Sequence, residues 1–133
     1  MEKLEHIGIA VKNLIHSKPL FELLLNTKCY KEELVLTESV RTAFFLVGGQ
    51  KIELLESTNA GSIIEKFIAK KGEGIHHIAF KVTDIESEMK RLSEEGFEIL
   101  NDKPVPGADN KLVCFLHPKN TNGVLIELCM DKP

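Results

Sequence analysis

The chain has no tryptophan, one tyrosine, three cysteines and no long apolar run. A membrane-spanning helix needs about 20 consecutive apolar residues, so we expect no membrane segment. Cys29, Cys114 and Cys129 are odd in number and lack CxxC spacing, which argues against a disulfide framework and favours reduced thiols. The shortage of aromatic side chains argues against a protein that sequesters an aromatic drug, because such cavities need aromatic walls.

Charge of neither sign is in large excess. The net charge of −3 provides no electrostatic basis for binding nucleic acid or an anionic membrane. The 133 residues are 43% hydrophobic and 28% charged, as is typical of a folded globular domain. A strand is expected from Leu4 onward, which leaves no room for a targeting peptide. We therefore expect one cytoplasmic domain spanning residues 1–133.

What the chain does contain is an internal repeat. Residues 4–11 (LEHIGIAV) reappear as residues 75–82 (IHHIAFKV), and residues 51–56 (KIELLE) are echoed by residues 124–129 (VLIELC). The first echo places His6 on His77, and the second places Glu53 on Glu127. Each half therefore contributes one histidine and one glutamate at matching places.

The first half is predicted to be a β-α-β-β-β module of about residues 1–58. Its helix is expected to be capped by Ser17, with Pro19 in the first turn and an apolar stripe at Phe21 and Leu23–Leu25. Gly48 and Gly49 are expected to form the turn between the last two strands. The four strands are expected at residues 4–11, 29–36, 41–47 and 50–56.

The second half repeats this order over about residues 73–133, after a connector helix within 60–72. Ser62 and Glu65 fit a capping box for the connector, and Lys70, Lys71 and Gly72 fit its end. The other helix is expected at 84–95, and the strands at 75–82, near 97–101, at 112–117 and at 124–130. Residues 104–110 form a non-periodic loop, which we expect to cover the substrate as a flap.

Strand alternation places the matched histidines on one face of the sheet. Successive side chains of a strand point to opposite faces, so His6 lies with small Gly8 and Ala10, and His77 lies with Ala79. The bulky alternate residues would pack against the helices. This pattern predicts a curved sheet with a cavity on the histidine side.

Two imidazoles and two carboxylates on matching positions predict a site for one divalent metal ion, held by His6, Glu53, His77 and Glu127. This ligand set suits Co, Zn, Mn or Ni and does not choose among them. His76 competes with His77, but the repeat aligns His76 with Glu5, on the opposite face.

These residues resemble a known family. Paired modules with His and Glu at these places are similar to the vicinal oxygen chelate (glyoxalase) superfamily. Within it, residues 6–11, 51–56, 72–80 (GEGIHHIAF), 115–119 (FLHPK) and 123–128 closely resemble the methylmalonyl-CoA epimerase family. The resemblance covers essentially the whole chain. It implies an α+β fold in which two paired β-α-β-β-β modules form a curved, incompletely closed eight-stranded barrel.

The resemblance also implies a function. Members of that family are homodimeric isomerases that interconvert (2R)- and (2S)-methylmalonyl-CoA with one divalent metal ion per chain. Some bacterial members carry a glutamate, proposed as a base, about where Thr42 stands here. A glyoxalase I-type lyase acting on a glutathione hemithioacetal is the nearest alternative. A metal-free binding or resistance protein of the same fold and an extradiol dioxygenase are more distant ones.

Epimerisation needs a base that removes the C2 proton and an acid that returns one to the opposite face. We expect Glu127 to be one of these groups and Glu53 to be the weaker candidate for the other. Lys111 and Lys119 flank the long loop and are candidates for contacts with an acyl-CoA substrate, as is His117 at a predicted strand end.

Overall fold

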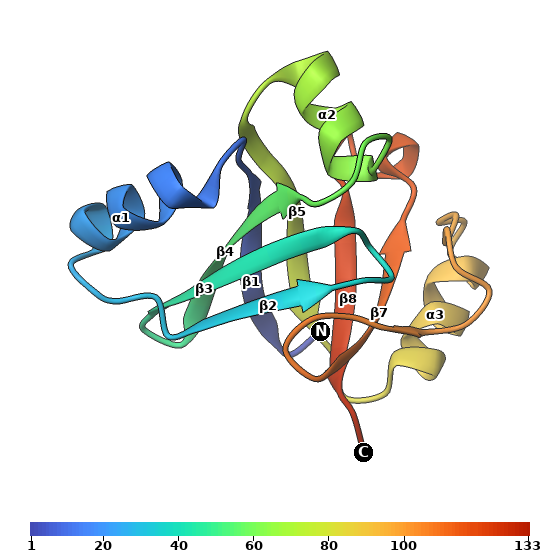
Figure 1. Cartoon of the computed structure of the whole chain (residues 1–133). Coiled ribbons are helices and arrows are strands. Elements are labelled where there is room, and N and C mark those ends of the chain that lie inside the picture. The colour runs from blue at the N-terminus through green and yellow to red at the C-terminus, as the bar shows by residue number, and fades with distance from the viewer. The chain divides into compact units, whose positions relative to one another are not determined.

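The computed structural model describes residues 1–133. Three α-helices and one short 3-10 helix accompany eight strands (Figure 1). The elements are, in chain order, β1 Lys3–Ala10, α1 Leu14–Leu25, β2 Lys31–Val35, β3 Val40–Val47, β4 Gln50–Ser57, α2 Ile63–Lys71, β5 Gly74–Lys81, α3 Ile85–Glu94, β6 Val105–Pro106, β7 Lys111–Leu116, η1 Pro118–Asn120 and β8 Ile126–Asp131. None of the helices has the length and the apolar character that a membrane-spanning helix requires.

The strands form one eight-stranded sheet in the order β2-β3-β4-β1-β5-β8-β7-β6. The predicted module pattern is confirmed: β1-α1-β2-β3-β4 is followed by β5-α3-β6-β7-β8, with α2 between the two. In each module the first strand pairs in parallel with the last, β1 with β4 and β5 with β8. The last two strands of each module form an antiparallel pair.

The chain divides into two compact units. The N-terminal unit is His6–His76, and the C-terminal unit combines His77–Pro133 with Met1–Glu5. A backbone hydrogen bond and an ion pair join the first residues to the rest of the C-terminal unit. The Glu2 N–H donates to the Lys81 carbonyl at 2.8 Å, and the Met1 amino group lies 3.4 Å from the Glu88 carboxylate. The prediction of a single domain stays a prediction.

The core of the N-terminal unit lies under α1. Leu14 of α1 is buried with Val11, Ala43, Phe45 and Leu54, and partly buried side chains of α1, β1 and β4 pack against them. The Phe21 and Phe45 rings lie 6.3 Å apart, centroid to centroid. These strand residues have the parity opposite to that of His6 and Glu53, so the bulky side of this half-sheet faces the helix, as predicted.

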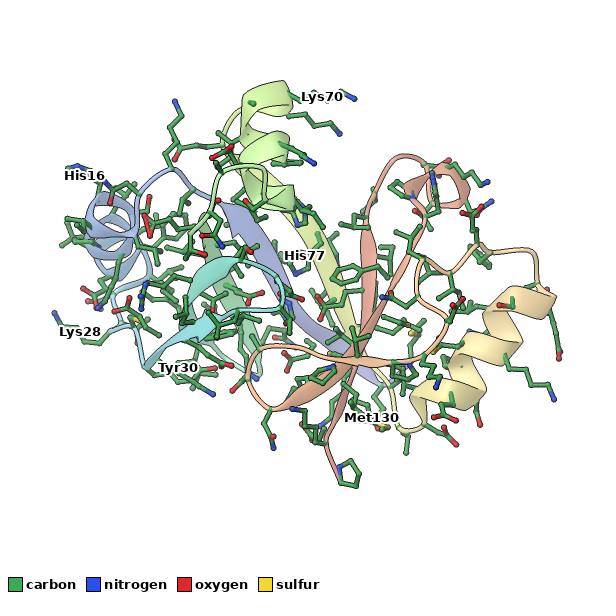
Figure 2. All side chains as sticks on the ribbon, turned by 45° about the vertical axis from the view of Figure 1, so that its right-hand side comes forward. His16, Lys28, Tyr30, Lys70, His77 and Met130 are labelled. Atoms are coloured by element: carbon green, nitrogen blue, oxygen red, sulfur yellow. The ribbon has the colours of Figure 1, made fainter.

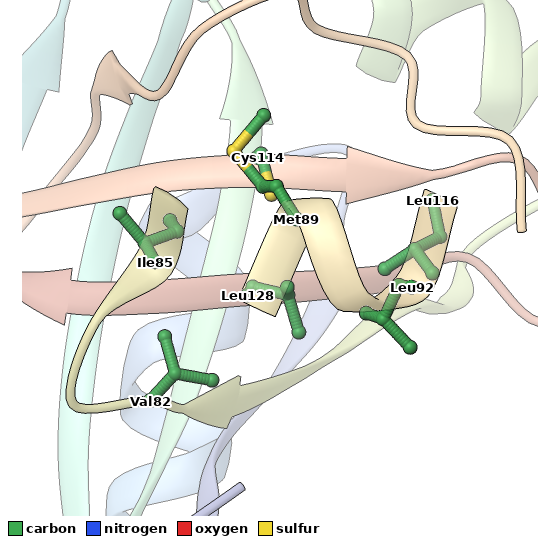
Figure 3. Packing of buried hydrophobic residues seen from close by; sticks show 7 residues of the cluster. All are labelled: Val82, Ile85, Met89, Leu92, Cys114, Leu116 and Leu128. Carbon is green, nitrogen blue, oxygen red and sulfur yellow. The ribbon is translucent and has the colours of Figure 1, made fainter. Parts of the chain in front are cut away.

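The core of the C-terminal unit lies under α3 in the same way. Asp84 caps this helix, and its carboxylate accepts a hydrogen bond from the Ser87 N–H at 3.2 Å. The buried side of α3 faces residues of β7, β8 and the end of β5 (Figure 3). The buried cluster consists of Val82, Ile85, Met89, Leu92, Cys114, Leu116 and Leu128.

The start of α1 differs from the prediction. The helix begins at Leu14, because the Asn13 side chain accepts a hydrogen bond from the Ile15 N–H at 2.8 Å. Ser17 and Pro19 therefore lie inside the helix rather than at its start. Asn and Ser are equally good N-caps, and the preference of proline for the first turn pointed to the wrong one.

The predicted apolar stripe of α1 is also only half right. Phe21 and Leu25 pack on the core, but Leu23 is 82% exposed and Leu24 is 69% exposed. Beginning the helix at Leu14 places Leu14, Phe21 and Leu25 on the side that faces the sheet.

The segment predicted as a strand near 97–101 forms no ladder. It makes one isolated bridge, Ile99 with Leu116, because Asn101 turns its side chain to the Phe115 N–H at 2.9 Å. The short strand β6 lies instead inside the predicted loop, where Val105–Pro106 pairs with β7. The Gly107 N–H donates to the Lys111 carbonyl at 2.9 Å, so this loop is a hairpin closed on β7.

The connector helix matches its prediction. Ser62 caps α2 and accepts a hydrogen bond from the Glu65 N–H at 3.1 Å, while the Glu65 carboxylate accepts one from the Gly61 N–H at 2.9 Å. The helix ends at Lys71, and Gly72 follows with a positive φ of 81°. Such a backbone angle favours glycine.

Candidate functional site

The N-terminal unit places one histidine beside one glutamate. His6 on β1 and Glu53 on β4 are both buried, and His6 Nε2 lies 3.2 Å from Glu53 Oε1. The parallel register pairs Gly8 with Glu53. The two side chains therefore come from adjacent strands and project to the same face of the sheet.

The C-terminal unit repeats this arrangement. His77 on β5 and Glu127 on β8 are buried, and His77 Nε2 lies 3.3 Å from Glu127 Oε1 (Figure 2 labels His77). The register pairs Ala79 with Glu127, so the glutamate again lies opposite the residue two positions after the histidine. The sequence repeat is thus reproduced in strand pairing and in side-chain contact.

Each pair has the chemistry of metal ligands. An unprotonated imidazole nitrogen and a carboxylate oxygen are both acceptors, so a buried pair at this distance needs a cation between them, either a proton or a metal ion. Two ligand atoms bonded to one ion at about 2.0–2.2 Å and separated by about 90–109° lie roughly 2.8–3.6 Å apart. The separations in both units fall in this range.

His6, His77 and Glu127 are buried residues of a kind that could hold a metal ion. Glu53, the fourth predicted ligand, is not among these three, although it contacts His6. The choice of His77 over His76 agrees with the packing, because the His76 ring meets Phe67 of α2 edge-on at 5.0 Å. His16 is exposed on α1.

A phenylalanine lies opposite each glutamate. The antiparallel registers pair Phe44 of β3 with Glu53 and Phe115 of β7 with Glu127. The Phe115 ring meets the His77 ring edge-on, with centroids 6.0 Å apart. The sequence pattern does not indicate these residues, because only the hairpin registers reveal that each aromatic ring shares the face of its glutamate.

The charge of Glu127 affects the pKa of Cys114, a thiol on the other face of the sheet. Burial raises the pKa of the Cys114 thiol to about 12, and the negative charge of Glu127 contributes to the same rise. Cys129 has the parity of Glu127, but it is fully buried and its Sγ lies 3.6 Å from the Phe80 carbonyl.

The residues predicted to contact substrate have varied surroundings. His117 caps η1 and accepts a hydrogen bond from the Lys119 N–H at 3.0 Å. Lys119 is exposed and pairs with Glu98 at 2.6 Å, and this ion pair lowers the pKa of Glu98. Lys111 is half-buried beside Asp131. Thr42 is fully buried on β3, and its hydroxyl donates to the Glu33 carbonyl at 3.5 Å.

Comparison with known proteins decides the family. The sequence profile of the Glyoxalase/Bleomycin resistance protein/Dioxygenase superfamily matches residues 5–115. The chain belongs to this superfamily. This confirms the superfamily that the sequence resemblance indicated, and with it the glyoxalase fold.

Several members of the superfamily are similar over nearly the whole chain. The uncharacterized protein YqjC of Bacillus subtilis is 38% identical over 99% of this chain and 94% of its own length. The mitochondrial methylmalonyl-CoA epimerase of Dictyostelium discoideum is 39% identical over 95% of this chain and 76% of its own length. A structure of a Streptomyces coelicolor methylmalonyl-CoA epimerase variant in complex with 2-nitronate-propionyl-CoA is 31% identical, with a TM-score of 0.94 over 98% of this chain and 95% of its own.

Proposed function

We propose that this protein is a methylmalonyl-CoA epimerase that interconverts the (2R) and (2S) forms of its substrate. The observation that carries the proposal is the pair of buried His–Glu contacts, one in each module, at equivalent positions of the two modules. The similarity to methylmalonyl-CoA epimerases supports the choice of substrate. The oligomeric state expected with this function is a homodimer.

The residues that would hold a divalent metal ion are His6, His77 and Glu127, with Glu53 as the fourth. When bound, such an ion would stabilise negative charge on the thioester oxygen while the C2 proton is absent. The two histidines would each offer Nε2 and would be kept in place by the sheet, since both are buried on strands.

The two glutamates are the groups that we assign to the removal and return of the C2 proton. Inversion at C2 needs one group that removes the proton and another that delivers a proton to the opposite face. We assign the removal on one face to Glu127, whose carboxylate lies between His77 and the Phe115 side of the sheet. Glu53 is its counterpart in the other module, and we assign it to the opposite face.

Thr42 does not replace a second base. Its hydroxyl is buried and donates to a main-chain carbonyl, and an aliphatic hydroxyl is not basic. Glu53 therefore stays the candidate for that role. In each module the phenylalanine paired with the glutamate, Phe44 beside Glu53 and Phe115 beside Glu127, would limit the access of water to that carboxylate.

The test is exchange of the C2 proton of methylmalonyl-CoA with solvent deuterium. The wild-type protein is expected to exchange the proton of both epimers. Glu127→Gln is expected to lose at least about a hundredfold in the exchange rate of the one epimer whose C2 proton faces Glu127, the usual contribution of a positioned base. The metal content of the variant is measured alongside, so that loss of the base is separated from loss of the ion. Glu98→Gln, an exposed glutamate of the same unit, is the matched control.

Two results would contradict the proposal. One is exchange of both epimers at the wild-type rate by Glu127→Gln with its metal retained, which would remove Glu127 from the proton chemistry. The other is turnover of the methylglyoxal–glutathione hemithioacetal with no exchange on methylmalonyl-CoA, which would favour the glyoxalase-type lyase.

A further inference from the structure

The C-terminal unit carries a second set of charged groups on the same face as His77 and Glu127. Lys81 lies four residues after His77 on β5, and Asp131 lies four residues after Glu127 on β8. Lys111 lies four residues before Phe115 on the antiparallel strand β7. Because alternate residues of a strand share a face, all three project to the side that carries the histidine and the glutamate.

The three charged groups form one cluster. The register pairs Lys111 with Asp131. Lys111 Nζ lies 2.5 Å from Asp131 Oδ1, and Lys81 Nζ lies 3.3 Å from Asp131 Oδ2. Both lysines, with hydrogen bonds from Lys111 as the largest cause, lower the pKa of Asp131. One carboxylate thus holds two ammonium groups close together, and the cluster keeps a net positive charge.

The burial of the cluster is uneven. The Lys111 side chain is 12% exposed and the Lys81 side chain is 29% exposed, whereas the Asp131 side chain is 58% exposed. Each ammonium group has three N–H donors, and the contact with Asp131 accounts for only part of them. An anion that approached from the open side of Asp131 would find donors from two lysines.

The distance along the strands decides which anion fits. Four residues of a strand span about 13 Å, so Asp131 and Lys111 lie roughly that far along the sheet from the Glu127–Phe115 pair. The free carboxylate of a methylmalonyl group is too near the reacting carbon to reach so far. A phosphate at the other end of a long thioester carrier has the required separation.

We propose that Lys81 and Lys111, held together by Asp131, bind a phosphate group of the nucleotide end of an acyl-CoA substrate. This inference rests on the proposed function and names which part of the substrate this face recognises. Lys81 was not among the residues that the sequence pointed to, and the acyl carboxylate is excluded as the group that Lys111 contacts.

The experiment measures binding of free coenzyme A by isothermal titration calorimetry. Lys81→Gln and Lys111→Gln are each expected to weaken binding about tenfold, because each removes a charge-assisted hydrogen bond. Dephosphorylated pantetheine, which lacks the nucleotide and its phosphates, is expected to bind the wild type and both variants alike. Lys90→Gln, an exposed lysine on α3, is the matched control and is expected to bind as the wild type does.

The readout separates this inference from the proposed function. Coenzyme A binding is measured without catalysis, so an absence of epimerase activity would not by itself affect the result. Equal affinity of the wild type, Lys81→Gln and Lys111→Gln for coenzyme A would overturn the phosphate site even if epimerisation is observed. An equal loss of pantetheine binding would also overturn it, because the lysines would then act on the carrier arm. Circular dichroism and thermal unfolding of each variant ensure that the folded protein is compared.

Discussion

The thiol of Cys114 illustrates how a single buried group makes stability depend on pH. The side chain is fully buried, and its pKa is raised from 9.0 to about 12, first by burial and then by the charge of Glu127. The unfolded chain therefore releases this proton at a lower pH than the folded chain does. The stabilising contribution is complete below about pH 9 and is lost as the pH rises toward 12.

Between pH 8 and pH 10.5 the free energy of unfolding of the wild type is expected to fall by about 2 kcal/mol more than that of Cys114→Ala. Urea unfolding of both proteins at pH 8 and at pH 10.5 measures it, and the difference between the two pH dependences isolates the thiol. Parallel pH dependences would show that Cys114 ionises as easily in the folded protein as in the unfolded chain.

Reagents for thiols provide a second measurement at the same scale. Only the thiolate reacts, so Cys114 is expected to stay unmodified by a disulfide reagent at pH 8 in the folded protein. The half-buried Cys29 is expected to react first. Mass spectrometry of peptides after a short exposure identifies the modified residue, and rapid labelling of Cys114 would contradict its high pKa.

Individual residues also mark how far the sequence could predict the site. His6, His77, Glu53 and Glu127 were found because the repeat aligned identical side chains, and the strand registers place each His beside its Glu. Phe115 and Lys81 carried no such signal. Their positions opposite Glu127 and beside Asp131 follow from hairpin register and side-chain reach, which a repeat does not encode.

At the scale of the elements, α1 shows why one helix was predicted poorly and α3 well. The first part of α1 offers two capping residues, Asn13 and Ser17, and a proline that suits a first turn. The start of α3 offers Thr83 and Asp84, which are neighbours and so predict nearly the same helix start, followed by an unambiguous apolar periodicity. Capping signals of equal strength cannot be ranked without the contacts of the helix with the sheet.

The orientation of α1 is tested by two leucine substitutions. Leu14→Ala removes a side chain that is 4% exposed, and we expect it to lower the free energy of unfolding by about 2–4 kcal/mol. Leu23→Ala removes one that is 82% exposed and is expected to change it by less than about 0.5 kcal/mol. Urea unfolding measures both, and a larger effect of Leu23→Ala would mean that the helix presents the opposite side.

The cap of α2 gives a prediction about a helix end. The Ser62 hydroxyl accepts the Glu65 N–H and contacts the Ser57 hydroxyl at 2.5 Å, so Ser62→Ala is expected to cost about 1 kcal/mol of stability. Ser93→Ala, at an exposed position late in α3, serves as the control in thermal and urea unfolding. A cost no larger than that of the control would show that the cap contributes nothing.

At the scale of the whole molecule, metal binding is expected to raise the unfolding temperature of the protein. An ion that binds the folded state alone stabilises it in proportion to its affinity and concentration. Protein treated with a chelator is therefore expected to unfold at a higher temperature after addition of Co²⁺ or Zn²⁺. The shift is expected to vanish in His77→Ala and to persist in His16→Ala, which changes an exposed histidine. An equal shift in both variants would place the ion elsewhere.

The fold of the whole chain was more accessible to sequence reasoning than its details were. Duplicated patterns predict duplicated modules, and seven of the strands form where alternation predicted them. The exception is the segment near Ile99, where Asn101 bonds the β7 main chain through its side chain instead of extending a ladder. A side-chain oxygen and a backbone carbonyl can compete for the same N–H donor, and only the tertiary packing decides which of them accepts the hydrogen bond.

The division of the chain into units has a consequence for its synthesis. One unit is continuous from His6 to His76, but the other needs Met1–Glu5 together with the last strand. A ribosome releases the first five residues long before β8 exists. They must therefore wait for their partners on β5 and α3 until the whole of the N-terminal unit has been made, and a fusion partner placed before Met1 would hinder this step more than one attached after Pro133.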